Sequence, residues 1–172
     1  MRNLILAVLI LSGLALPGAA LAATGDGAGP AEIAFTAEGD PGTIVIRTSE
    51  RKLYLVTGEG RALAYDIAVG KPSEQWFGKS WVSKKRPNPT WTPTPSMRQK
   101  NPRLPQSVGP GPKNPLGERA INLGWGAYRI HGTNNPRSIG SAASAGCFRM
   151  RNEDVRDLYD RVNVGAQVVV LR

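Results

Sequence analysis

The chain has only one cysteine and one histidine among its 172 residues. A single thiol cannot close a disulfide within the chain, so a disulfide-built scaffold is excluded. One thiol and one imidazole fall short of the three or four nitrogen and sulfur ligands of a usual zinc site. We therefore expect no metal and no cofactor. Zinc-finger spacing, RNA-binding signatures and interleaved aromatic residues are also missing, which argues against a nucleic-acid partner.

Long apolar runs are confined to the N-terminus. A basic start at residues 1–3 precedes the apolar segment 4–16, a break at Pro17-Gly18 and small residues at 20–22. This order is typical of a cleavable secretory signal peptide. The apolar segment is shorter than the ~20 residues that span a bilayer, which disfavours a membrane anchor. We expect residues 1–22 to be a signal peptide and the protein to be exported.

The rest of the chain is long enough for one domain with a real core. Residues 23–41 are rich in Gly, Ala and acidic side chains without a strong period, and we expect a flexible lead-in there. Residues 42–172 are expected to form the domain. The whole chain carries 22 basic against 13 acidic residues, a net charge of +9. This excess predicts either attraction to polyanions such as cell-wall polymers or simply a well-solvated face.

Short runs of β-branched and aliphatic residues predict a mainly β domain, arranged as an antiparallel sandwich or meander. One helix is expected directly after the cysteine. Asn152 is its candidate N-cap, and apolar residues then recur with helical spacing up to Val162. The expected strands are 43–47, 52–56, 62–69, 120–123, 128–130 and 167–171.

Residues 71–117 hold most of the prolines, three of the four tryptophans and much of the basic excess. Loops this long inside a domain are usually functional or disordered. Tryptophans favour order, because they need surfaces on which to pack. We expect an ordered, extended loop with short strands near residues 79–83 that forms one wall of a cleft. The alternative is that its tryptophans only fix the loop to the core.

The histidine and the cysteine, His131 and Cys147, lie 16 residues apart in one glycine-rich window. A free thiol has a pKa of about 8.5, and imidazole pairing lowers it by taking up the proton. The pair therefore predicts a thiol nucleophile with His131 as general base. The second imidazole nitrogen needs an acceptor, for which the carbonyl of Gly132 and the side chains of Asn134 and Asn135 are candidates.

Four further residues of the window are candidates for the site. Gly146 lets a backbone approach closely, and the amides around Gly146 and Cys147 are candidate oxyanion donors. Arg149 is suited to hold a substrate carboxylate or to stabilise a thiolate, or else to bond loop carbonyls structurally. Ser144 and Thr133 carry hydroxyls that suit substrate contacts or local turns.

The wording of this window resembles the YkuD-type L,D-transpeptidase family. The chain has Ile130-His131-Gly132-Thr133-Asn134, then Ser138-Ile139-Gly140, then Ser144-Ala145-Gly146-Cys147-Phe148-Arg149. The family pattern is H-G-T, a Ser-Ile-Gly step and S-x-G-C-x-R. The likeness extends over most of residues 42–172. The chain departs from the family at Ala145, where many members have His, and at Phe148, where an aliphatic residue is common.

The resemblance implies a periplasmic enzyme of peptidoglycan biosynthesis, active in cell-wall organisation and cell shape. Cys147 attacks the carbonyl of the L-centre of diaminopimelate in a tetrapeptide stem and releases D-Ala. The thioester then passes to an amine of a second stem, or of an outer-membrane or wall-anchored protein. His131 is the implied base, the Gly132 carbonyl its orienting partner and Arg149 a site residue.

Two other functions remain open at this point. The first uses the same thioester but passes it to water, as an L,D-carboxypeptidase or an amidase. The second is a non-catalytic, basic cell-wall-binding module in which the cysteine is incidental. The module gives no reason for a lone Cys and a lone His in one window. The sequence leaves the acceptor amine and the oligomeric state open.

Overall fold

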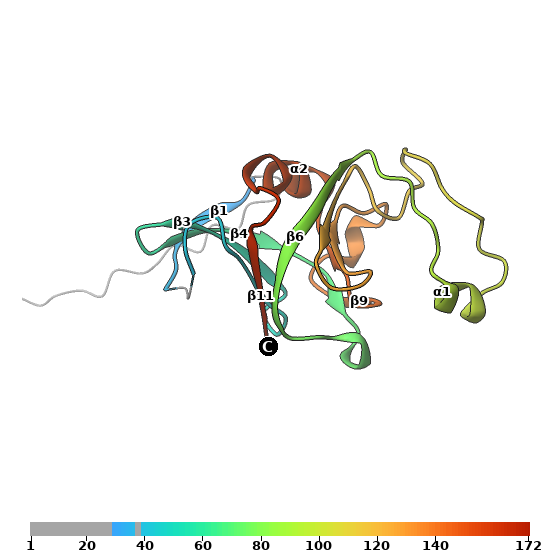
Figure 1. The fold of residues 1–172 in the computed structure, drawn as a ribbon, viewed down its shortest axis with the longest axis horizontal. Helices are drawn as coiled ribbons and strands as arrows, with labels where there is room; N and C mark the ends of the chain where they lie inside the picture. Colours follow the sequence, from blue (N-terminus) through green and yellow to red (C-terminus); the bar gives the residue numbers. More distant parts are fainter. Residues whose placement is uncertain (1–28, 37–38) are drawn as a thin grey trace, which may run out of the picture.

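The computed structural model describes residues 29–36 and 39–172, so the expected signal peptide lies outside the described residues. Strands are the main regular structure of the described chain, with two α-helices and two short 3-10 turns (Figure 1). The strands are β1 (Ala31–Ala34), β2 (Ile44–Arg47), β3 (Lys52–Gly58), β4 (Arg61–Asp66), β5 (Val69–Gly70), β6 (Gly78–Pro87), β7 (Arg119–Leu123), β8 (Arg129–His131), β9 (Ala142–Ser144), β10 (Phe148–Arg149) and β11 (Gln167–Leu171). The helical segments are η1 (Pro72–Glu74), α1 (Pro95–Lys100), η2 (Pro136–Ser138) and α2 (Asn152–Arg161).

Nine strands form one sheet in the order β1-β4-β3-β2-β11-β6-β7-β8-β10, and β5 pairs with β9. The predicted mainly β class is confirmed. The sheet is mixed rather than wholly antiparallel, because β2 and β11, β8 and β10, and β5 and β9 pair in parallel. The predicted meander corresponds to β2, β3 and β4, which pair antiparallel in sequence order.

Strand β6 joins the two parts of the sheet. Its first residues pair with β11 and its later residues with β7, with a register shift between Val82 and Lys84. Such irregularities bend a strand and increase its twist. Figure 1 shows β6 in green between β11 in red and the orange-brown strands around β9. The sequence suggested only short strands near 79–83, but one ten-residue strand is present.

The core lies between the sheet and α2, which packs on β7 and β8. Helix residues Val155 and Leu158 are fully buried with Ile121, Ile130 and Phe148 of the strands. This confirms the apolar face expected for the helix. The N-terminal assignment is wrong by one residue, because the N-cap is Arg151 and Asn152 is already helical. No helix in residues 29–36 and 39–172 has the length and apolar character needed to cross a bilayer.

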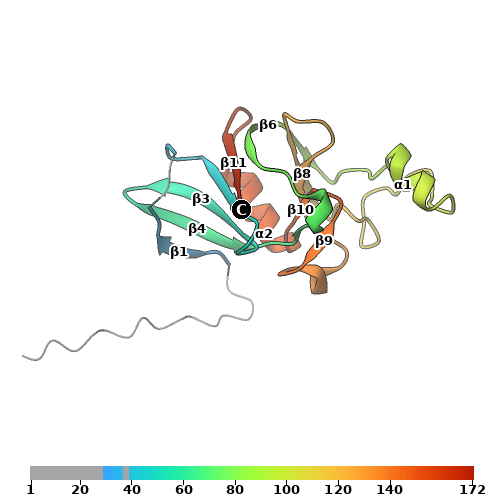
Figure 2. The ribbon, with the colours of Figure 1, turned by 90° about the horizontal axis from the view of Figure 1, so that it is seen from below.

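Two further expectations differ from the structure. Strand β1 lies inside the expected lead-in and pairs with β4, while Phe35 is buried and stacks on Tyr54 with 4.4 Å between ring centroids. Residues 31–35 are therefore part of the sheet rather than a flexible lead-in. The segment 88–117 is not strand-like but contains α1, and it projects at the end of the molecule opposite β3 and β4 (Figures 1 and 2).

Asn114 holds the base of this segment together. Its side chain is buried and donates to the carbonyls of Pro89 at 2.6 Å, Gly109 at 2.9 Å and Val108 at 3.2 Å. Its Oδ1 accepts a hydrogen bond from the Leu116 amide at 2.8 Å. Because one buried amide satisfies several backbone groups, both ends of the long segment are fixed beside the domain.

Candidate active site

Parallel pairing of β8 and β10 brings the histidine and the cysteine together. Phe148 is in register with Ile130 and Arg149 with His131, and the Met150 amide donates to the His131 carbonyl at 2.8 Å. Phe148 and Ile130 point into the core. Because side chains alternate along a strand, Cys147, Arg149 and His131 point to the opposite face. The two predicted reactive residues thus emerge on one face from adjacent strands.

The imidazole of His131 is fixed by its neighbouring carbonyl. Nδ1 lies 2.6 Å from the Gly132 oxygen, and a carbonyl can only accept, so Nδ1 carries the hydrogen. The Nε2 lone pair is then free to take a proton. Of the three candidates for this acceptor, the structure places Gly132 there. Asn134 instead donates to the Lys113 carbonyl at 3.0 Å, and the Asn135 amide donates to Thr133 Oγ1 at 3.0 Å.

Burial controls the charge of the histidine. Burial, together with the positive charges of Arg149 and Arg129, lowers the pKa of His131 to about 4, although the bond to Gly132 opposes the change. An imidazole with this pKa is neutral at pH 7, so it is available as a base. The charge state therefore agrees with the tautomer that the Gly132 carbonyl imposes.

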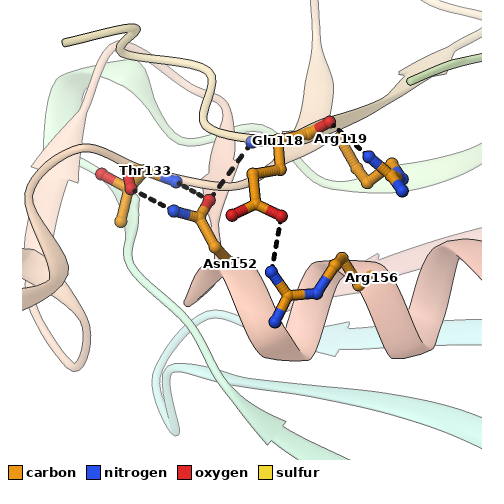
Figure 3. A network of polar contacts seen from close by, with 5 residues as sticks. All are labelled: Glu118, Arg119, Thr133, Asn152 and Arg156. Carbon is orange, nitrogen blue, oxygen red and sulfur yellow. Dashed lines mark hydrogen bonds and ion pairs between the residues drawn. The ribbon is translucent and has the colours of Figure 1, made fainter. Parts of the chain in front are cut away.

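Asn152 fixes the peptide group that orients the histidine (Figure 3). Its Oδ1 accepts from the Thr133 amide at 3.2 Å and from the Glu118 amide at 3.3 Å, and its Nδ2 donates to the Thr133 carbonyl at 3.1 Å. The Thr133 amide belongs to the same peptide plane as the Gly132 carbonyl that holds Nδ1. Asn152 thus acts on His131 through one peptide unit. The sequence analysis assigned Asn152 only as a helix N-cap and did not predict this role.

The thiol environment differs from the sequence-based expectation. Burial raises the pKa of Cys147, while the amide and guanidinium of Arg129 and the charge of Arg149 oppose the rise. The sulfur donates to the Ala127 carbonyl at 3.8 Å. The expectation of a lowered thiol pKa is therefore not met in this state, because burial disfavours the thiolate. Proton transfer to His131 requires the thiol to leave Ala127.

The turn before the cysteine is held by Ser144 and by an aromatic wall. The Gly146 amide donates to Ser144 Oγ at 3.2 Å, and this hydroxyl donates to the Cys147 carbonyl. The expected oxyanion role of the Gly146 amide is therefore not available in this state. The Cys147 amide has no acceptor among residues 29–36 and 39–172. The hydroxyls of Ser144 and Thr133 form hydrogen bonds within local turns. The sequence analysis gave this role as the alternative to substrate contacts.

Gly146 is required by conformation and by space. Its φ is +97°, and a Cβ there would lie 2.6 Å from Cε1 of Tyr128. Trp76 Nε1 donates to the Gly146 carbonyl at 3.0 Å, and the Trp76 ring stacks on Tyr128 with 4.9 Å between centroids. Sequence reasoning missed Tyr128, and the Gly-Trp-Gly-Ala-Tyr run before the histidine was the available signal. Trp76 lines the site as well as fixing the loop.

Two arginines lie on the face of the sheet that carries His131 and Cys147, called the catalytic face below. The backbone of Arg149 pairs with Ala68 in both directions, at 2.8 and 2.9 Å. Its guanidinium bonds no loop carbonyl within the described residues, which disfavours the structural alternative for this side chain. Sequence reasoning missed Arg129, whose position two residues before His131 on the same strand places it on the same face.

A groove adjoins the histidine side of the site. Its lining includes Asn88, Gly111, Glu118, Asn134 and Arg151, together with Thr133. Cys147 is not among the lining residues, so the groove leads toward the Thr133 turn rather than onto the sulfur itself. In the same described part of the chain, no three His, Cys, Asp or Glu side chains cluster as metal ligands would.

Comparisons with known proteins agree on one family. The sequence model of the YkuD family, an L,D-transpeptidase catalytic domain, matches residues 41–170. The chain is 37% identical over 136 residues to the probable L,D-transpeptidase ErfK/SrfK of Escherichia coli K12, covering 74% of this chain and 43% of that protein. The chain therefore spans less than half the length of this relative.

Solved structures show the same fold. The L,D-transpeptidase from Mycobacterium smegmatis has a TM-score of 0.58 at 18% identity, covering 76% of this chain and 58% of that one. A Brucella melitensis protein is 49% identical with a TM-score of 0.55, covering 83% and 92%, and is titled a probable carnitine operon oxidoreductase.

Proposed function

Because the chain belongs to the YkuD family of L,D-transpeptidase catalytic domains, we propose that it is a cysteine-dependent acyltransferase acting on peptidoglycan stem peptides. Cys147 is the nucleophile and His131 the general base. The donor is a tetrapeptide stem, attacked at the carbonyl of the L-centre of diaminopimelate. The observation that supports this proposal is the pairing of β8 and β10, which puts Cys147 and His131 on one face of adjacent strands, together with the bond to the Gly132 carbonyl that fixes the imidazole tautomer.

The reaction has two halves. In the first, the thiol proton passes to His131 Nε2, sulfur bonds to the carbonyl carbon, and the C–N bond to D-Ala breaks as its amine takes the proton from the imidazolium. In the second, an acceptor amine gives a proton to Nε2 and bonds to the thioester carbon, the C–S bond breaks, and the sulfur takes the proton back from the imidazolium to restore the thiol. The Cys147 amide is the available donor for the oxyanion in both halves. Arg149 lies beside the thioester to hold a substrate carboxylate.

A neutral resting pair suits this sequence of steps. With a raised Cys147 pKa and a lowered His131 pKa, the site holds no separated charges before the substrate arrives. Substrate displaces the thiol from Ala127 toward the imidazole, and proton transfer then accompanies attack. Charge therefore develops only in the transition state, where the nearby amide and arginines stabilise it.

The acceptor decides between two functions of the same site. An amine of a second stem, or of an outer-membrane or wall-anchored protein, gives a cross-link or an anchor. Water gives an L,D-carboxypeptidase or amidase. We also propose export to the periplasm, on the strength of residues 1–22.

The test is incubation of the mature protein with purified tetrapeptide muropeptides, followed by mass analysis. Cross-linked dimers with loss of D-Ala support the transpeptidase, and trimmed stems alone support the hydrolytic alternative. Neither product, together with unchanged wall binding by Cys147→Ala, supports the non-catalytic module. A carbapenem is a second probe, since a thioester-forming cysteine opens its β-lactam. Intact mass should show one adduct on the wild type and none on Cys147→Ser.

A further inference from the structure

Guanidinium groups extend across the catalytic face away from the cysteine. Continuing the register of β10 and β8 by one residue places Cys147 beside Arg129. On the next strands, His131 is in register with Ala120, and Ala120 with Arg86 of β6. Arg129 therefore adjoins the sulfur, and Arg86 lies two strands beyond the imidazole on the same face. Neighbouring strands are about 4.8 Å apart, so the backbones of β8 and β6 are about 10 Å apart, roughly the length of three extended peptide residues.

Arg86 and Arg129 are partly buried cations. None of the ion pairs in residues 29–36 and 39–172 involves Arg86, Arg129 or Arg149. The Nε atoms of Arg86 and Arg129 are buried without a hydrogen-bond acceptor. Their charges also repel, since Arg129 helps to lower the pKa of Arg86. Buried donors without acceptors are costly, and such a group in a native site calls for a ligand.

We propose that Arg129 and Arg86 form a carboxylate-binding site of the donor stem, next to the attacked carbonyl. The inference rests on the proposed function for the identity of the donor. Besides the carboxylate of the D-Ala that leaves, a tetrapeptide stem carries carboxylates that stay on the acyl group, on the second centre of diaminopimelate and on the glutamate before it. Planar guanidinium groups bind such a group bidentately, and a carboxylate supplies the missing acceptors and counter-charge. Binding there positions the donor for Cys147.

The decisive experiment pairs arginine variants with amidated substrates. Arg129→Gln and Arg86→Gln are assayed with the free-acid tetrapeptide and with stems amidated at the diaminopimelate or at the glutamate carboxylate. We expect each variant to lose about ten- to hundredfold in kcat/KM on the free acid, the range of a charged hydrogen bond. On the stem whose amidation removes the recognised carboxylate, the loss should disappear. This stem also identifies which carboxylate is bound.

Arg129 also affects the pKa of Cys147, and the design separates the two effects. A changed thiol pKa lowers activity on every substrate equally, so equal losses on free and amidated stems overturn the proposal. Arg137→Gln is the matched control, because Arg137 is exposed on η2 and forms no ion pair in the described residues. It should retain wild-type kcat/KM on all three stems.

A binding arm distinguishes failure of this proposal from failure of the proposed function. Cys147→Ser, alone and combined with Arg129→Gln, is titrated with free and amidated stems by calorimetry. Preference for the free acid that vanishes with Arg129→Gln supports the carboxylate site even if the wild type turns over no stem. Turnover by the wild type without any such preference overturns the carboxylate site and leaves the transpeptidase standing.

Discussion

The two ends of the main sheet differ in whether their cationic side chains form ion pairs. On the strands β1 to β4, cations are paired: Arg61 with Glu32 at 2.8 Å and Lys52 with Asp66 at 2.6 Å. On β6, β8 and β10, the arginines of the catalytic face have no carboxylate partner among the described residues. Among the buried side-chain atoms without a partner in the described residues, the two that belong to charged groups are Nε of Arg86 and Nε of Arg129, so the ligand is expected at the catalytic part.

Buried polar groups show the same contrast. The β1–β4 part buries apolar groups such as Phe35 and Val56, whereas the catalytic part buries His131, Thr133 and Ser144. The latter are held by specific hydrogen bonds to loop backbone rather than by the regular ladder. Loss of one side chain in the catalytic part should therefore affect the chemistry, while loss of an apolar side chain in the β1–β4 part should lower stability and leave the chemistry unchanged.

The largest effect is expected from the nucleophile. Cys147→Ala should lower turnover of tetrapeptide stems by about 10⁴-fold or more, since no other group supplies the thioester. The melting temperature should change little, because the thiol makes only the long contact to Ala127. Muropeptide mass analysis and a thermal melt measure the two quantities. Residual turnover near the wild-type rate would contradict the assignment of Cys147.

The buried histidine should make stability depend on pH. Its folded-state pKa of about 4 lies below the value of about 6.5 in an unfolded chain. Between these values the unfolded chain binds the proton and the folded protein does not, so stability rises with pH across that window and falls on acidification. The difference reaches about 3 kcal/mol. It should be absent in His131→Gln, and denaturant melts at pH 4 to 7 on both proteins measure it.

The pKa of the Cys147 thiol should be higher than that of a free cysteine. Because burial dominates over the arginine charges, the pKa of Cys147 is raised, and the iodoacetamide rate should climb with pH through a midpoint above about 8.5. Because the chain has a single cysteine, the alkylation rate reports on Cys147 alone. A midpoint well below that of a free thiol would mean that the resting pair is thiolate and imidazolium. His131→Gln separates the imidazole's contribution from that of burial.

Asn152 offers the sharpest test of how the catalytic part is positioned. Asn152→Ala leaves two amides and one carbonyl without their partner and should lower the free energy of unfolding by about 2–3 kcal/mol. Weaker polarisation of the Gly132 carbonyl should also shift the imidazole titration and its Nδ1–H tautomer. Nitrogen-15 NMR reads both, because the chain has a single histidine.

The control for Asn152 lies on the same helix. Arg156 pairs with the Glu118 carboxylate but does not touch the Thr133 peptide (Figure 3). Arg156→Ala should leave the imidazole signals unchanged and cost little stability, as exposed ion pairs contribute less than about 1 kcal/mol. If both variants shift the histidine equally, Asn152 acts only through general loosening of the helix start.

Much of the fold was predictable from local patterns. Period-two and helical spacing located β2, β3, β11 and the apolar face of α2, because burial of one face dictates those patterns. The same reasoning missed β1, whose sequence Ala-Glu-Ile-Ala has little β character and which is ordered by pairing with β4. Pairing across the sheet is a long-range property that no short window records.

The residues of the candidate site also divide into those that the sequence predicted and those that it did not. The thiol and the imidazole were identifiable because each is unique in the chain, and the Gly132 carbonyl was one of three candidates. The role of Asn152 was hidden because its position also suits an N-cap, and only the approach of residues 117–118 and 132–133 shows where its amide points. Arg86 and Arg129 needed the strand register, which places residues 43 positions apart in sequence on one face.

The smallest effect is expected in the paired part of the sheet. Arg61 and Glu32 form an exposed ion pair between β4 and β1, and solvent and salt screen such pairs. Arg61→Gln should leave the thermal melt, the histidine NMR signals and kcat/KM on free-acid stems unchanged. Arg129→Gln is the same substitution on an arginine without a partner, so it should change kcat/KM while Arg61→Gln does not. If the two variants behave alike on the free-acid and amidated stems, the contrast between the two ends of the sheet is structural and carries no function.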